Sequence, residues 1–90
     1  MDLLALTHQE VLDRIARHCP RAMATYLQCI NLSKNNPRKP ITFTRYHIER
    51  EMYENFTMFK NNLKKLALEN LLEWQLLDNT IFITMADIND

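Results

Sequence analysis

Apolar residues recur every three or four positions through residues 7–33, which is the spacing of one face of a helix. Thr7 and Glu10 fit a capping box, in which the threonine hydroxyl accepts from the Glu10 amide and the carboxylate accepts from the Thr7 amide. Pro20 ends this first helix and suits the first turn of another. The pattern therefore predicts two helices in residues 1–33.

Residues 33–40 are polar and contain two prolines, so we expect a loop there. The following segment, residues 41–44, alternates in polarity and is rich in β-forming residues, which predicts a short strand. Thr44 can then cap a short third helix. We expect residues 53–55 to form the turn after that helix.

A longer helix is predicted over residues 56–69, because its apolar and polar residues separate onto opposite arcs at 100° per residue. The inner arc consists of Phe56, Phe59, Leu63, Leu66 and Ala67. The outer arc consists of Thr57, Met58, Asn61, Lys64, Lys65 and Leu68, with Lys60 and Asn62 at its borders. Asn70 is expected to end the helix in a left-handed conformation.

The last apolar segment fits a β-hairpin in one register. If Asp78 and Asn79 form a two-residue turn, Leu77 pairs with Thr80 and the remaining pairs follow. The apolar pairs then share one face of the hairpin: Leu76–Ile81, Trp74–Ile83 and Leu72–Met85. The pairs on the other face are Glu73–Thr84 and Gln75–Phe82. Beyond the hairpin, residues 86–90 are expected to form a frayed acidic tail.

The chain has 90 residues, of which 47% are hydrophobic, so we expect a single folded domain over residues 1–90. Its expected parts are the N-terminal helices (1–33), a helical pair with a hairpin (41–85) and the tail (86–90). No apolar run is long enough to span a membrane, and the N-terminus does not have the pattern of a signal peptide. A cytoplasmic protein with no membrane partner is therefore expected.

The sequence contains no glycine, so we expect asparagine or aspartate wherever the backbone needs a positive φ. The usual phosphate-binding loop is excluded for the same reason. Ser33 is expected in a loop without a catalytic partner, and Cys19 and Cys29 are expected to be ordinary buried thiols. We therefore expect no enzyme, no metal site, no cofactor and no small-molecule substrate.

Charge is unevenly distributed along a chain whose formal net charge is zero. Residues 34–65 contain eight basic and three acidic residues, whereas residues 66–90 contain five acidic residues and no basic ones. A basic face of this kind is what a nucleic-acid reader requires, although chance clustering also produces such a difference in a short chain.

The order of these elements resembles the winged helix-turn-helix domain of prokaryotic transcriptional regulators. The resemblance covers residues 41–85 and rests on Ile41-Thr42-Phe43-Thr44, Ile48, Met52 and the run from Leu63 to Leu72, with Asn70 where glycine is usual. It implies a mostly helical α+β fold of three to four helices, with a C-terminal β-hairpin wing and a short third strand. It further implies a regulator that binds specific double-stranded DNA with helix 56–69 in the major groove.

The outer arc of the predicted recognition helix carries the candidate DNA contacts. Asparagine can pair with adenine, and lysine can reach guanine or phosphate. The candidates on this helix are Thr57, Lys60, Asn61, Lys64 and Lys65. Arg45, Arg50 and Lys39 are candidate phosphate contacts outside it. The alternative is that these residues form only a solvated polar face.

Two features favour a different function. The predicted wing tip, residues 78–80, has no basic residue and would be repelled by phosphate. Met58 and Leu68 are apolar residues on the outer arc. The alternative function is thus a protein-binding winged-helix adaptor or inhibitor. A DNA reader of this size would typically act as a homodimer, and we interpret the small stand-alone domain as a plasmid or phage regulator.

Overall fold

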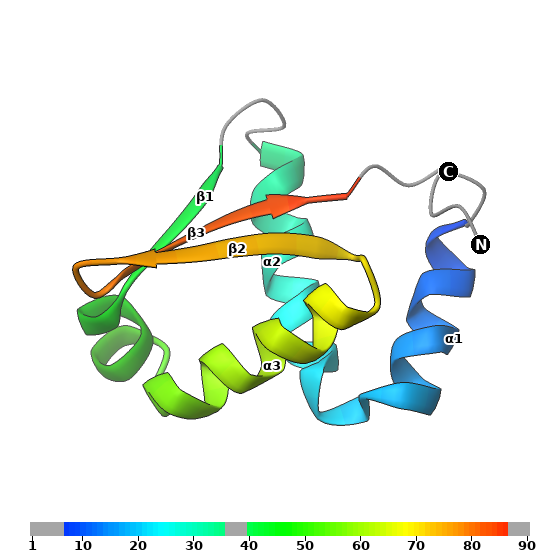
Figure 1. The fold of residues 1–90 in the computed structure, drawn as a ribbon, viewed down its shortest axis with the longest axis horizontal. Coiled ribbons are helices and arrows are strands. Elements are labelled where there is room, and N and C mark those ends of the chain that lie inside the picture. The colour runs from blue at the N-terminus through cyan, green and yellow to red at the C-terminus, as the bar shows by residue number, and fades with distance from the viewer. Residues whose placement is uncertain (1–6, 36–39, 87–90) are drawn as a thin grey trace.

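The computed structural model describes residues 7–35 and 40–86. These residues form an α+β fold with three α-helices, two short helical turns and a three-stranded antiparallel sheet (Figure 1). The predicted fold class is confirmed at this level. In chain order the elements are α1 (His8–His18), η2 (Pro20–Ala22), α2 (Met23–Asn35), β1 (Ile41–Thr44), η3 (His47–Glu51), α3 (Phe56–Leu68), β2 (Leu72–Leu77) and β3 (Thr80–Met85).

The predicted start of α1 is confirmed, because Thr7 and Glu10 form the capping box. The Glu10 backbone N–H donates to Thr7 Oγ1 at 3.2 Å, and the Thr7 N–H donates to Glu10 Oε1 at 3.4 Å. Pro20 opens η2, as its fixed φ and missing donor favour. The chain therefore turns from α1 into α2 within a few residues.

The predicted end of the second helix is wrong, because α2 continues through Asn35. Ser33 consequently lies within a helix and not in a loop. The physical reason is that no proline or glycine lies between Pro20 and Pro37, and Lys34 is a good helix former. The predicted acidic tail lies outside the described residues, except for Ala86.

The predicted hairpin register is confirmed pair by pair, from Leu72 opposite Met85 to Leu77 opposite Thr80. Asp78 and Asn79 have φ values of 48° and 63°, as a type I′ turn requires. The third strand, β1, pairs with β3, so the strand order is β1-β3-β2.

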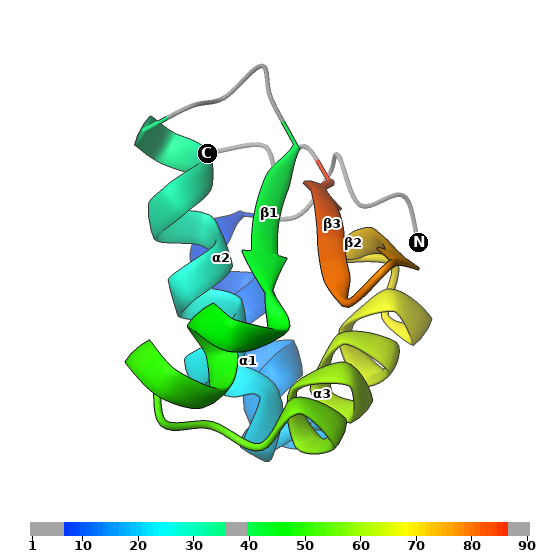
Figure 2. The same cartoon turned by 90° about the vertical axis from the view of Figure 1, so that its left-hand side faces the viewer.

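The helices cover one face of this sheet (Figures 1 and 2). α2 packs against β1 and β3, whereas α3 packs against β2. One apolar core joins these layers, and within it Phe59 of α3 meets Phe43 of β1 edge to face, with ring centroids 5.2 Å apart. The outer side of α3 is thereby left at the surface.

The predicted short third helix exists, but its winding is wider than an α-helix. Thr44 Oγ1 accepts from the His47 backbone N–H at 3.0 Å, as expected for a cap. The Met52 N–H then donates to the His47 carbonyl, five residues back, which defines the π-helical turn η3. Ile48 is fully buried, as a core residue of this helix should be.

The turn between η3 and α3 contradicts the expectation that asparagine or aspartate takes every positive-φ position. Asn70 has a φ of 60° and agrees with it, but Tyr53 has a φ of 54°. A backbone hydrogen bond from Glu54 N to Ile48 O, at 2.9 Å, closes the end of η3 and requires this bend. Tyr53 therefore adopts a conformation that costs an ordinary L-residue about 1–2 kcal/mol.

Tyr53→Asn is expected to raise the free energy of unfolding by about 0.5–1 kcal/mol, because asparagine tolerates the left-handed region better. Tyr53 is 88% exposed, so little packing is lost. Tyr46→Asn is the matched control, since Tyr46 is also exposed but has a φ of −57°. Urea unfolding of both variants measures the difference, and equal effects at the two positions would contradict the strain at Tyr53.

Candidate nucleic-acid interface

The candidate interface is the outer side of α3. Asn55 caps this helix, since its Oδ1 accepts from the Met58 N–H at 3.0 Å. The predicted arcs are confirmed: the buried residues are Phe56, Phe59, Leu63 and Leu66, with Ala67 half-buried. The exposed residues are Thr57, Met58, Asn61, Lys64, Lys65 and Leu68. α3 thus contains three lysines and no acidic residue.

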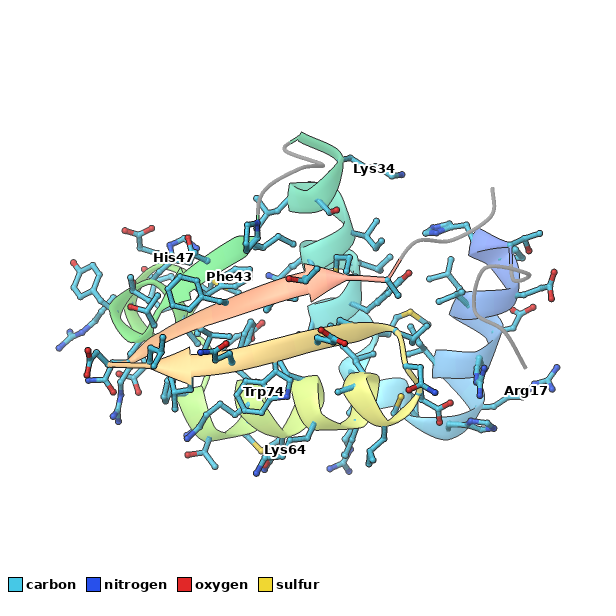
Figure 3. All side chains as sticks on the ribbon, turned by 45° about the horizontal axis from the view of Figure 1, so that its top comes forward. Arg17, Lys34, Phe43, His47, Lys64 and Trp74 are labelled. Carbon is cyan, nitrogen blue, oxygen red and sulfur yellow. The ribbon has the colours of Figure 1, made fainter. Side chains whose placement is uncertain are left out.

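Thr57, Asn61, Lys64 and Leu68 form one line along α3, because their spacing of four, three and four residues follows the helical repeat. The polar side chains of this line make no hydrogen bond or ion pair with other described residues. Figure 3 shows Lys64 on the side of α3 that faces away from the sheet. A helix of 13 residues is about 20 Å long, so this line can reach several base pairs in a major groove.

Two further cations lie at the start of α3 and share the ring of Phe56. Lys60 Nζ lies 4.8 Å from the ring centroid, and Arg45 Cζ lies 5.0 Å from it. Arg45 Nε also donates to Glu49 Oε2 at 3.2 Å, which offsets part of its charge. The structure therefore brings predicted residues Arg45 and Lys60 together. Arg50 is exposed on η3, and Lys39 lies outside the described residues.

The tip of the hairpin is attached to the start of η3. The backbone N–H of Arg45 donates to the Asn79 carbonyl at 2.8 Å, and Thr44 pairs with Thr80 beside it. Asp78 is exposed at this tip. Arg45 and Arg50 line a hollow beside this tip together with Asp78, so a phosphate there would meet charges of both signs.

A second feature, which the sequence did not reveal, joins α1 to the end of α3. Glu69 accepts from Arg14 Nε at 2.7 Å and pairs with His18 Nδ1 at 2.9 Å. Although burial alone raises its pKa, the hydrogen bonds and charges of His18 and Arg14 hold the pKa of the Glu69 carboxyl below its usual range. No local pattern predicts this contact, because the partners are 51 and 55 residues apart.

Glu69→Gln is expected to lower the free energy of unfolding at pH 7 by about 1–2 kcal/mol, because a charge-assisted contact is lost. The folded carboxyl has a lowered pKa, so its contribution is present above the unfolded pKa and is lost as the pH falls through the folded value. The variant should therefore show a weaker loss of stability on acidification below about pH 5. Urea unfolding across pH measures this effect.

Glu73→Gln provides the control, since Glu73 is exposed on β2 and pairs with no cation among the described residues. Equal pH profiles for Glu69→Gln and Glu73→Gln would show that the contact between α1 and α3 contributes no stability.

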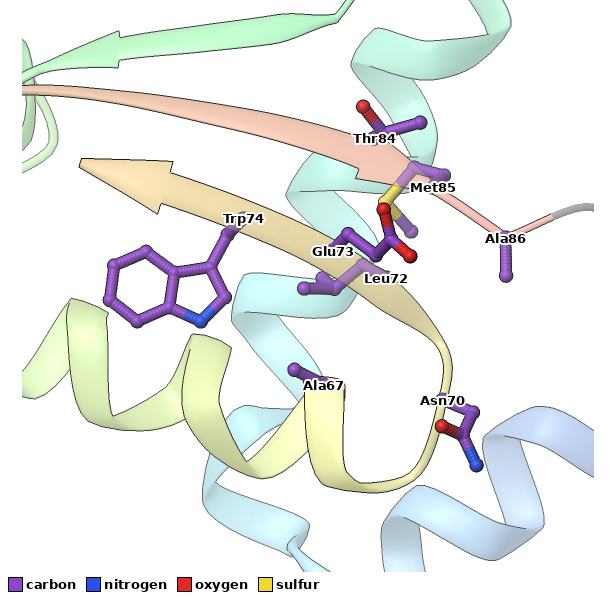
Figure 4. Close-up of a pocket in the computed structure, with 8 residues that line it drawn as sticks. All are labelled: Ala67, Asn70, Leu72, Glu73, Trp74, Thr84, Met85 and Ala86. Carbon is purple, nitrogen blue, oxygen red and sulfur yellow. The ribbon is translucent and has the colours of Figure 1, made fainter. Parts of the chain in front are cut away.

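A hollow beside β2 is a poor candidate for a nucleic-acid site (Figure 4). Its lining residues come from α3, β2 and β3 and include Ala67, Trp74, Glu73 and Thr84. The hollow is open, and its lining contains an acidic residue but no basic one. It therefore offers no attraction for phosphate.

Comparisons with known protein families, curated proteins and solved structures gave no match for this chain. Among residues 7–35 and 40–86, no helix has both the length and the apolar character that crossing a membrane requires.

Proposed function

We propose that this protein is a winged-helix regulator that binds specific double-stranded DNA with α3 in the major groove. The observation that carries the proposal is the exposed outer line of α3, which combines lysine and asparagine with no acidic residue. The order of β1, η3, α3 and the β2–β3 hairpin supports the same proposal, because it is the order of a helix-turn-helix followed by a wing.

Each part of α3 has a distinct role in this proposal. Asn61, at the centre of the outer face, pairs with an adenine edge, and Thr57 lies one turn before it. Lys64 and Lys65 bind guanine or phosphate. Lys60 and the nearby Arg45 contact the backbone at the N-terminal end of the helix, where the ring of Phe56 restrains both cations.

One observation favours a second candidate function, a protein-binding adaptor or inhibitor that uses the same face. Leu68 is 83% exposed and Met58 is 49% exposed, although both are apolar. In a DNA complex such side chains contact a thymine methyl group or remain outside the groove. In an adaptor they are buried by the partner.

A mobility-shift titration of genomic fragments at low salt tests the leading proposal. We expect a retarded complex with a subset of fragments at protein concentrations where a neutral control protein gives none. The absence of such a complex would refute DNA binding. A protein partner that is captured by the wild type and lost on Leu68→Glu would then support the adaptor.

The homodimer, the cytoplasmic location and the plasmid or phage origin remain predictions from the sequence. Sedimentation of the protein with and without its selected duplex measures the oligomeric state directly.

A further inference from the structure

The hairpin tip has no basic residue of its own, and the cations beside it come from Arg45 and Arg50 of the neighbouring segment. Arg45 and Lys60 lie at the N-terminal end of α3, where they can contact phosphate. The opposite end of α3 lies beside the turn between α1 and η2, which we call the α1–η2 corner (residues 17–21). Like η3, which carries Arg50, this corner both adjoins α3 and carries exposed arginines.

The α1–η2 corner is fixed to the C-terminal half of α3 by independent contacts. η2 packs directly against α3. Arg14 and His18, from the last two turns of α1, both bind Glu69 at the end of α3. Burial is the main cause of the raised pKa of the Cys19 thiol, but the charges of Glu69 and Lys65 also act on it.

The corner has a positive charge that is available to a ligand. Arg17 and Arg21 are exposed, and neither forms an ion pair with another described residue. Glu69, the cap residue after α3, has its charge already offset by Arg14 and His18. Figure 3 shows Arg17 at the end of the molecule opposite to η3. In that view Lys64 lies between these two ends.

We infer that Arg17 and Arg21 form a second phosphate-binding site, which contacts the DNA backbone beyond the C-terminal end of α3. This inference rests on the proposed function. The site takes the place of a basic wing, so the protein holds the duplex through α1 and η2 on one flank and through Arg45 and Lys60 on the other. Arginine is well suited to this contact because its planar group binds phosphate through two parallel hydrogen bonds.

The double variant Arg17→Gln/Arg21→Gln tests the inference with a selected duplex and a scrambled one. Each phosphate contact contributes about 0.9 to the slope of log K against log salt, so we expect the slope to become shallower by about 2 for both sequences. Hydroxyl-radical footprinting should lose protection at one end of the site only. Arg17→Lys/Arg21→Lys retains the charge and should keep most of the slope.

Lys34→Gln is the control for loss of a positive charge elsewhere. Lys34 is exposed near the far end of α2, at the opposite end of that helix from η2 (Figure 3). We expect it to leave both the slope and the footprint unchanged.

The results separate this inference from the proposed function. If Arg17→Gln/Arg21→Gln binds with the wild-type slope and footprint while variants of Lys64 and Lys65 are weakened, the corner is not a phosphate site and α3 still reads DNA. If the wild type itself binds no duplex, both proposals are wrong. Circular dichroism checks that the variants are folded, as expected for two exposed arginines without ion-pair partners.

Discussion

Replacing Lys64 and Lys65 together with glutamine is expected to weaken binding to every duplex by about 60-fold at 0.1 M salt. Each lost phosphate contact changes the salt slope by about 0.9, which corresponds to about eightfold in affinity at that concentration. Both lysines are exposed on α3 and have no ion-pair partner among the described residues, so glutamine should leave the fold unchanged. Fluorescence anisotropy over a series of salt concentrations measures both quantities.

Asn61→Ala should behave differently, because asparagine carries no charge and in the proposed complex Asn61 contacts a base. We expect the salt slope to stay at its wild-type value while the preference for the selected duplex falls by about 1–3 kcal/mol. The contrast between Asn61 and the two lysines separates recognition of the base sequence from electrostatic attraction to phosphate. If Asn61→Ala and Lys64→Gln/Lys65→Gln gave the same profile, the assigned roles on α3 would be incorrect.

Phe59→Ala is expected to lower the free energy of unfolding by about 3–5 kcal/mol, the largest effect on stability that we predict. Phe59 is 1% exposed, and its ring meets Phe43 at an interplanar angle of 61°. The truncation leaves a cavity between α3 and β1 and removes this aromatic contact. Since a domain of this size has a total stability of about 5–15 kcal/mol, a large part of it is lost.

Met58→Ala is the matched control, one residue earlier in the same helix. Met58 is 49% exposed on the outer arc, so its truncation should change stability by no more than about 0.5 kcal/mol. Urea unfolding of both variants gives the comparison. Similar midpoints for the two would contradict the placement of the two arcs of α3.

The parts of the fold that the sequence predicted correctly are those set by neighbouring residues. Asp78 and Asn79 are tolerant of positive φ, and this local turn determined every pair of the hairpin. The two arcs of α3 followed from the helical repeat, and Asn70 ended the helix with a φ of 60° as predicted. In each case the information lies within a few residues.

The features that the sequence did not predict depend on hydrogen bonds and ion pairs that form only in the folded chain. Tyr53 takes a positive φ because the π-helical end of η3 closes onto Ile48, and no residue preference indicates that. The pairing of Glu69 with Arg14 arises only when α1 packs beside the end of α3. The sequence did not single out Arg17 and Arg21 either, because residues 1–33 contain equal numbers of basic and acidic residues. In the structure both arginines are exposed and form no ion pair with the described residues.

The candidate site was predictable as an exposed polar arc, since the spacing of Thr57, Asn61 and Lys64 places them on one side of a helix. Its ligand is a separate question. The same arc includes Leu68, which is 83% exposed. A side chain that will contact a base and one that will contact a protein are equally exposed in the free protein. For this reason the function follows from binding measurements and not from the placement of α3.

The salt dependence of binding between the unmodified protein and duplex DNA tests the central proposal most directly. If α3 reads DNA, with cations from Arg45, Lys60, Lys64 and Lys65 on phosphate, log K should fall with log salt with a slope of about −4 or steeper. The protein should also bind one selected duplex more tightly than scrambled duplexes. A slope near zero, or no binding at low salt beyond that of a neutral control protein, would contradict the proposal.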